Sequence, residues 1–173
     1  MHLYIYYFIN KFEPDYIKKL NKNISIIYRN YTSPIDANLV IKIRDFCKQN
    51  GRKFYLSNNI KLGIKLKLDG VYFPSFNNNF RHLSYKFSKN FLIIGSAHNI
   101  KEMRIKERQG VEQIFLSSIF KKEKNYLGFY KFKKLSKLTN KKVIALGGIK
   151  KNNLKKIDLL NISGYSGISL FEK

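Results

Sequence analysis

The stretch KVIALGGIKKNNLKKIDLLNISGYSGISLF, residues 142–171, decides the fold of this chain. An apolar run at residues 143–146 ends on Gly147 and Gly148, and a basic, asparagine-containing helical segment then leads to a β-type run at residues 164–171. Strand, paired glycines, helix and strand in this order indicate a βα unit of a parallel sheet. The glycines leave backbone N–H groups exposed at a strand end. Such a turn suits an anion such as phosphate, and a tight turn without a ligand is the alternative.

The same rhythm runs through the preceding residues. Strands are predicted at residues 3–9, 24–31, 53–57, 71–74, 91–95 and 112–120, in addition to 143–146 and 164–171. Helical or loop segments separate them, including an apolar-periodic helix that Ser33-Pro34 should begin and Gly51 should end. Residues 60–68 alternate apolar and polar, which in isolation favours a strand. Because Asp69-Gly70 leads directly into a better strand, we expect a short helix at 60–67 instead.

Eight strands that alternate with helical segments predict an α/β fold, a compact TIM (β/α)₈ barrel formed by residues 1–173 as a single domain. The fourth helix should be short, because residues 77–90 are polar and loop-like, and no eighth helix follows the last strand. An open flavodoxin-like sheet is the alternative, although it uses about five strands. The missing helix would leave apolar surface on the outer wall, so we expect a homodimer contact or a repositioned helix to cover it.

Composition limits the classes of function. The chain has 34 Lys and Arg against 11 Asp and Glu, a net charge of +23, which ordinarily indicates nucleic acid or a membrane surface as partner. The cations are mostly lysines spread among many Asn, Ile, Tyr and Phe residues, a mixture typical of an AT-rich genome. No nucleic-acid-binding motif accompanies them, so no specific nucleic-acid partner is expected. No run approaches the ~18 apolar residues of a membrane span. Cys47 is the single cysteine, and we expect a soluble, cytoplasmic protein.

Five short motifs follow one another along the chain. They are Arg29, Asp69-Gly70-Val71, Gly95-Ser96-Ala97-His98 with Glu102, Ser117-Ser118-Ile119-Phe120, and the closing VIALGGI…N…GYSGIS. In this order they resemble the QxRxK, DGV, GVSxH…E, GPIF and VAIGGI…N…GADGVAVIS motifs of the thiamine phosphate synthase and thiazole tautomerase family. The resemblance covers nearly the whole chain and is most specific from residue 91 onward. It too implies a (β/α)₈ barrel.

The synthase of this family joins a hydroxymethylpyrimidine pyrophosphate to a thiazole phosphate and releases pyrophosphate. The resemblance therefore implies phosphorylated thiamine precursors as partners and thiamine biosynthesis as the role. The implied residues for the thiazole phosphate are Gly147, Gly148, Ile168 and Ser169, and those for catalysis at the pyrophosphate are Arg29, Ser96 and Lys124. Lys124 stands for the lysine that the loop 121–124 is expected to contribute.

The resemblance also implies Mg²⁺ as cofactor, held by two acidic residues. Asn58 and Asn77 stand at those positions in this chain. An amide oxygen offers no charge to the ion, so the expected metal site, Asn58 with Asn77, should bind Mg²⁺ weakly. The glutamine and lysine that flank the arginine in the family are Ile27 and Tyr31 here.

Three functional hypotheses remain open on the sequence. The first is a synthase-like transferase with a depleted Mg²⁺ site. The second is a non-catalytic or tautomerase-like paralogue that binds a thiamine-related phosphate, although Ser118 stands where the tautomerase branch is expected to carry a histidine. The third is a nucleic-acid binder driven by charge alone, whose affinity should fall steeply with salt. His98 is a further candidate acid or base, with a capping or packing role as the alternative.

Overall fold

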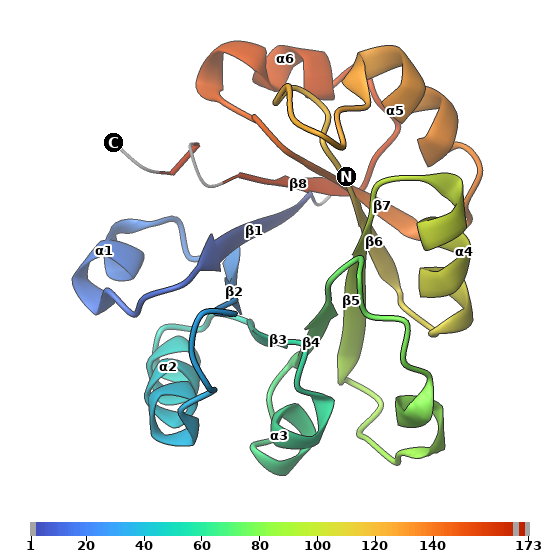
Figure 1. Cartoon of the computed structure of the whole chain (residues 1–173). Helices are drawn as coiled ribbons and strands as arrows, with labels where there is room; N and C mark the ends of the chain where they lie inside the picture. The colour runs from blue at the N-terminus through green and yellow to red at the C-terminus, as the bar shows by residue number, and fades with distance from the viewer. Residues whose placement is uncertain (1–2, 168–169, 172–173) are drawn as a thin grey trace.

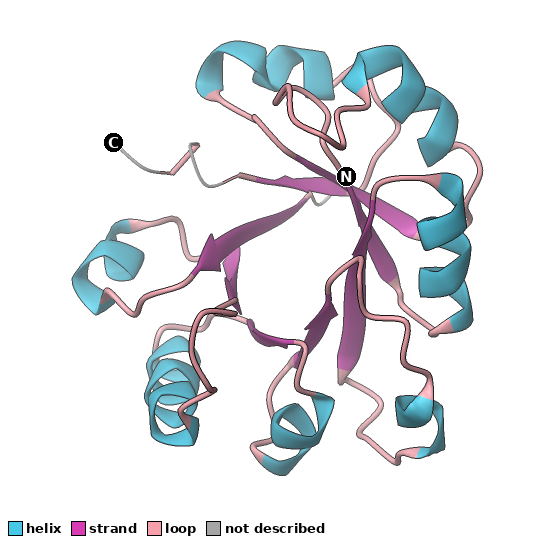
Figure 2. Cartoon of the chain, in the orientation of Figure 1, coloured by secondary structure: helices cyan, strands magenta, loops and turns pink. Residues whose placement is uncertain are grey.

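The protein is a closed barrel of eight parallel strands surrounded by helices (Figures 1 and 2). The computed structural model describes residues 3–167 and 170–171. Each strand pairs in parallel with the next one in sequence, and β1 pairs with β8 to close the ring, for example through Tyr4 opposite Gly164. The predicted TIM barrel is therefore confirmed, and the open flavodoxin-like alternative is excluded.

The elements alternate along the chain as predicted. The strands are β1 (Tyr4–Ile9), β2 (Ile24–Tyr28), β3 (Phe54–Ser57), β4 (Gly70–Phe73), β5 (Leu92–Ala97), β6 (Gln113–Leu116), β7 (Lys142–Leu146) and β8 (Gly164–Ser166). The helices are α1 (Pro14–Lys19), α2 (Ala37–Gln49), α3 (Ile60–Lys65), η1 (Arg81–Ser84), α4 (Ile100–Arg108), α5 (Gly128–Ser136), η2 (Lys151–Asn153) and α6 (Leu154–Ile157).

Local sequence explains where α2 begins and ends. Asp36 caps its first turn, and its side chain accepts a hydrogen bond from the backbone N–H of Asn38 at 2.8 Å. Gly51 follows the helix with φ +63°, a conformation that glycine adopts without strain. The prediction that Ser33-Pro34 begins this helix is wrong, because the aspartate cap three residues later provides the first hydrogen bond.

The short helix expected at residues 60–67 is confirmed as α3, although its local pattern alternates like a strand. Asn59 caps it by accepting from the backbone N–H of Leu62 at 3.1 Å. Gly63 is buried, and a Cβ there would lie 2.7 Å from the side chain of Val71 on β4. The cap and this close approach to the sheet decide the helix over the alternating pattern.

Aromatic side chains fill the interior of the barrel. Tyr6, Tyr55, Tyr72 and Phe115 are almost completely buried there together with the aliphatic Ile27. Their rings meet edge to face, with centroids 4.9 Å apart for Tyr6 and Phe115. Two further hydrophobic clusters pack between the outer wall and the helices. This packed interior lies beneath the carboxyl ends of the strands and closes the barrel to solvent there.

The short fourth helix is confirmed as the single 3₁₀ turn η1. The last strand and the sixth are shorter than predicted: β8 ends at Ser166 and β6 at Leu116, and residues 168–169 lie outside the described residues. No helix follows β8 in the described part of the chain, and Figure 1 shows the ring of helices interrupted between α6 and α1. Phe171 packs its ring on Tyr7 of β1, with centroids 5.5 Å apart. The homodimer stays a prediction.

Within residues 3–167 and 170–171, no helix combines the length and the apolar character needed to cross a membrane.

Candidate active site

A cavity of about 750 Å³ opens at the carboxyl ends of the strands. Residues at or just after the ends of β2, β4, β5, β6, β7 and β8 line it. In a (β/α)₈ barrel this end carries the site, because the loops that follow the strands converge there. The cavity therefore lies where chemistry is expected in this fold.

Gly147 and Gly148 lie together in the wall of the cavity, directly after β7. Their φ angles are +103° and +71°, in the left-handed region that favours glycine. The backbone N–H of neither glycine hydrogen-bonds to another described residue. Packing also requires glycine, because a Cβ on Gly148 would lie 2.6 Å from the backbone nitrogen of Lys121. The turn thus combines close packing with N–H groups that no other described residue accepts, and such donors suit an anion.

The loop after β7 is fixed from its far side. Asn153 donates its side-chain amide to the carbonyl oxygen of Gly148 at 2.9 Å, and its amide oxygen accepts from the backbone N–H of Lys150 at 2.9 Å. This pair of hydrogen bonds holds the glycine turn and brings Lys150 to the edge of the cavity.

Three cationic side chains line the cavity: Arg29, Lys121 and Lys150. The Arg29 guanidinium lies over the ring of Phe8, 4.7 Å from its centroid. Lys121 pairs with Glu123 at 3.0 Å, and Glu123 is the one carboxylate among the described residues that line the cavity. Positive charge therefore exceeds negative charge in the cavity, which favours an anionic ligand.

Ser96 and Tyr72 form the buried floor beneath Arg29. Ser96 is 4% exposed on β5, and Tyr72 is 2% exposed on β4. Burial raises the pKa of the Tyr72 hydroxyl to about 12, and the neighbouring Ser96 and Arg29 oppose part of that rise. The hydroxyl stays protonated at neutral pH and can donate a hydrogen bond.

An aromatic pair stands at the mouth of the cavity. The rings of Tyr31 and Phe76 meet edge to face with centroids 5.5 Å apart, and both side chains are at least half exposed. The Tyr31 hydroxyl is 2.7 Å from Ser57 Oγ, which fixes the tyrosine ring. These exposed faces offer a packing surface for a flat ring of a ligand.

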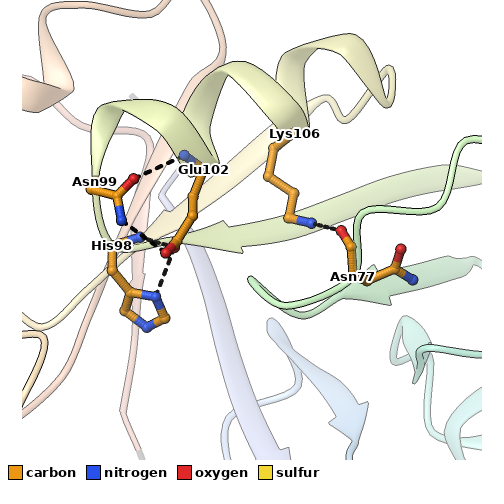
Figure 3. A network of polar contacts seen from close by, with 5 residues as sticks. All are labelled: Asn77, His98, Asn99, Glu102 and Lys106. Atoms are coloured by element: carbon orange, nitrogen blue, oxygen red, sulfur yellow. Dashed lines mark hydrogen bonds and ion pairs between the residues drawn. The ribbon is translucent and has the colours of Figure 1, made fainter.

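His98 lines the cavity at the end of β5, where a carboxylate fixes its ring (Figure 3). The Glu102 carboxylate accepts from the His98 backbone N–H at 2.8 Å and contacts His98 Nδ1 at 2.9 Å. Asn99 caps α4 by accepting from the Glu102 backbone N–H at 2.9 Å. The capping arrangement of Asn99 and Glu102 therefore also orients the histidine.

Asn58 and Asn77 lie next to each other but are not among the residues that line the cavity. Asn77 Nδ2 donates to Asn58 Oδ1 at 2.6 Å, and Asn77 Oδ1 accepts from the backbone N–H of Asn79 at 2.8 Å. Lys106 Nζ donates to the backbone oxygen of Asn77 at 2.6 Å (Figure 3). It also donates to Gln109 Oε1 at 2.8 Å. Burial lowers the pKa of the fully buried Lys106 ammonium from 10.5 to about 8.

This arrangement does not fit Mg²⁺. The ion prefers charged oxygen ligands in octahedral geometry, whereas Asn58 and Asn77 are neutral and already accept internal hydrogen bonds. The described residues also contain no group of three or more His, Cys, Asp and Glu side chains that could hold a metal ion. The residues for which the resemblance implies metal binding form a polar network instead.

The structure thus brings together Arg29, Ser96, Gly147 and Gly148 in one cavity. Lys124 is exposed and does not line it; Lys121 of the same loop does. Ile168 and Ser169 lie outside the described residues.

Lys150, Tyr31 and Phe76 also line the cavity, although the sequence analysis assigned them no functional role. Their position after β7, β2 and β4 is the signal that could have found them, since the loops after the strands meet at one end of the barrel.

Comparisons with known proteins agree with this architecture. The model of the thiamine monophosphate synthase family matches residues 23–171. A thiamine-phosphate synthase of Methanococcus vannielii is 27% identical over 132 residues, which are 74% of this chain and 64% of that protein. A putative thiamine-phosphate synthase 2 of Aquifex aeolicus is 28% identical over 138 residues, 77% of this chain and 73% of that protein. The chain thus covers less than two thirds of the Methanococcus vannielii protein.

Among solved structures, thiamine phosphate pyrophosphorylase from Pyrococcus furiosus superimposes with a TM-score of 0.80 at 19% identity. The superposition covers 96% of this chain and 86% of that protein, and it supports the barrel fold. Because the family model matches most of the chain, the chain belongs to the thiamine monophosphate synthase family.

Proposed function

We propose that this chain is a thiamine phosphate synthase-like transferase of thiamine biosynthesis, which joins a hydroxymethylpyrimidine pyrophosphate to a thiazole phosphate. The observation that carries the proposal is the convergence of Arg29, Ser96 and the Gly147-Gly148 turn on one cation-rich cavity in a member of this family. Its partners are therefore small phosphorylated precursors, and the buried free thiol of Cys47 favours the cytoplasm as its compartment.

The geometry supports a division of labour within the cavity. The carbon–oxygen bond to the pyrophosphate breaks, the electron pair leaves with pyrophosphate, and the thiazole nitrogen bonds to that carbon. Arg29, on the β2 side, faces the leaving group and stabilises its developing charge, with Ser96 and Tyr72 donating hydrogen bonds. The Gly147-Gly148 amides and Lys150 hold the thiazole phosphate on the β7 side.

The aromatic pair completes this assignment. Tyr31 and Phe76 stand at the mouth on the same side as Arg29, so they are placed to pack against the pyrimidine ring while the pyrophosphate extends inward. Holding both reactants in one cavity replaces a bimolecular encounter by a positioned one, which supplies part of the rate enhancement.

Turnover tests the proposal directly. The purified chain is given both substrates, and pyrophosphate and thiamine phosphate are measured over time. Arg29→Gln should lower kcat/KM by about 100-fold, the usual effect of removing one donor to a developing anion. Arg104→Gln is the matched control, because Arg104 is an exposed arginine paired with Glu107 on α4, and it should retain activity. Folded chain that forms neither product above background refutes the proposal.

A second candidate is the non-catalytic or tautomerase-like paralogue that binds a thiamine-related phosphate. The neutral Asn58–Asn77 pair favours it, because this pair does not provide the metal ligands that the resemblance implies. The second candidate predicts that thiazole phosphate raises the melting temperature without any pyrophosphate release, and that Lys150→Gln removes this shift. Pyrophosphate release by the wild-type chain contradicts it.

A further inference from the structure

We propose that the cavity binds a diphosphate directly on the chain's own cations and backbone amides, without Mg²⁺, and that the Lys106 ammonium holds the β4–η1 loop at the place where the resemblance implies a metal ion. The identity of the ligand as a diphosphate rests on the proposed function. The inference that Mg²⁺ is not needed rests on the side chains themselves, and it has its own experiments.

The oxygen atoms of the asparagine pair are already engaged. Asn58 Oδ1 accepts from Asn77 Nδ2, and Asn77 Oδ1 accepts from the Asn79 backbone and from Gln109 Nε2 at 3.3 Å. The backbone oxygen of Asn77 accepts from Lys106 Nζ and from Gln109 Nε2 at 3.0 Å. A cation bound here would have to displace several of these internal donors. The network therefore stabilises the metal-free conformation of the β4–η1 loop.

Charge opposes a divalent ion at the same place. The Lys106 ammonium hydrogen-bonds to the backbone of Asn77 itself, so an ion held by Asn77 would lie beside a buried positive charge. Burial in a low-dielectric surrounding strengthens that repulsion. Lys106 donates only to neutral oxygens, those of Asn77 and Gln109, and no carboxylate among the described residues forms an ion pair with it.

The nearby carboxylates are also committed elsewhere. Glu102 contacts His98 and Asn99, and Glu123 pairs with Lys121. Neither is hydrogen-bonded to the asparagine pair. A Mg²⁺ ion bound at the asparagine pair would therefore lack a charged protein ligand, which such ions ordinarily have.

Cationic side chains of the cavity supply the positive charge that a Mg²⁺ ion would otherwise bring to a diphosphate. Arg29, Lys121 and Lys150 line it from three different loops, so an extended anion can contact more than one of them at once. The N–H groups of Gly147 and Gly148, which no other described residue accepts, add neutral donors at the β7 side. Charge-assisted hydrogen bonds of this kind are the strong class, and they can offset the charge of a diphosphate without an added cation.

Calorimetry with inorganic pyrophosphate as probe, at physiological salt, tests the binding. Wild-type affinity should be the same with EDTA as with MgCl₂ to within about twofold, after correction for Mg²⁺ that pyrophosphate binds in solution. Arg29→Gln should lower the affinity by about tenfold, as expected for loss of one charge-assisted contact, whereas Arg104→Gln should not change it. Affinity that falls by more than about tenfold in EDTA overturns the inference.

Electron paramagnetic resonance of Mn²⁺ tests the metal site without any substrate. The wild-type chain should bind no Mn²⁺ below about 1 mM, and the triple variant Asn58→Asp, Asn77→Asp, Lys106→Met should gain Mn²⁺ affinity by at least about tenfold. Asn77→Asp alone serves where the triple variant does not fold. Wild-type Mn²⁺ binding tighter than about 1 mM overturns the inference.

The two proposals fail in different ways. Pyrophosphate binding that is indifferent to EDTA, together with no turnover, refutes the synthase proposal and leaves this inference standing. Turnover and pyrophosphate binding that both require Mg²⁺ refute the inference and leave the synthase proposal standing. No pyrophosphate binding under either condition overturns the inference.

Discussion

Replacing Lys106 by methionine should change how the stability of the protein depends on pH. The Lys106 side chain is fully buried, its ammonium contacts only neutral oxygens, and burial lowers its pKa from 10.5 to about 8. Glu102, one turn earlier on α4, opposes part of that fall. Methionine keeps the length and much of the volume of the side chain but cannot titrate.

The size and sign of the effect follow from linkage. A pKa that is lower in the folded chain than in the unfolded chain means that the unfolded chain binds more protons between these two values, so stability rises with pH there. The full difference from 10.5 to about 8 corresponds to about 3 kcal/mol. Between about pH 7 and about pH 9.5 the folded chain becomes neutral at Lys106 while the unfolded chain stays charged, and roughly 2 kcal/mol of this appears.

Urea unfolding followed by circular dichroism at both pH values measures the free energy of unfolding of the two proteins. The wild-type chain should gain roughly 2 kcal/mol relative to Lys106→Met as the pH rises from about 7 to about 9.5. Other groups contribute in this range, notably Cys47, which ionises there in the unfolded chain but not in the folded chain, where burial raises its pKa to about 12. These groups are common to both proteins and cancel in the comparison. If the free energy of unfolding depends equally on pH in the two proteins, burial does not lower the pKa of the Lys106 ammonium.

Three further substitutions test the packing and the cavity. Gly148→Ala should lower the free energy of unfolding by about 3 kcal/mol and the melting temperature by about 9 °C. The reason is that φ is +71° at this position and that the added Cβ would meet the backbone of Lys121. An unchanged melting curve would contradict this. Arg52→Met should lower the free energy of unfolding in urea by about 3 kcal/mol, since the buried guanidinium donates to carbonyl oxygens at and after the end of α1; a loss below about 1 kcal/mol would contradict it. Phe76→Leu should weaken the binding of a hydroxymethylpyrimidine phosphate, measured by calorimetry, about fivefold. Stability should not change, since Phe76 is 62% exposed. Equal affinity would show that the aromatic pair with Tyr31 does not pack against the ligand.

The fold could be predicted from the sequence because each level of the pattern agreed. Apolar runs at regular spacing and turn glycines both indicated alternating strands and helices, and α3 was predicted correctly from its place in that alternation. The prediction failed at element ends. Ser33-Pro34 has the composition of a helix start, yet Asp36 forms the cap, and the sequence does not rank two adjacent capping signals.

Arg29 and Ser96, which the resemblance implies, line the cavity, and Gly147 and Gly148 could also be predicted there from backbone geometry. Gly147 and Gly148 stand out because no other residue tolerates their conformation and their contact with the loop after β6. Lys121 was not separated from Lys124, because lysines in a loop have no periodicity that fixes which one points inward. The role of Lys106 could not be predicted either, since a lysine on α4 resembles a solvated surface residue until the β4–η1 loop is seen to cover it.

The glycine turn after β7 and the asparagine pair beside the cavity differ in what a substitution costs. At the β7 end, positive φ and close backbone contacts allow only glycine, so losing Gly147 or Gly148 would damage the fold as well as the site. In the asparagine pair, Asn58 has φ +58°, a conformation that both Asn and Asp tolerate, and these two side chain types have nearly the same shape. An aspartate there can therefore become an asparagine without moving the backbone, and the amide of Asn77 then bonds to its neighbour as a second carboxylate could not. The metal ligands can thus be replaced while the glycine turn is kept, provided that the cations of the cavity neutralise the charge of the ligand. Pyrophosphate binding in EDTA tests this condition.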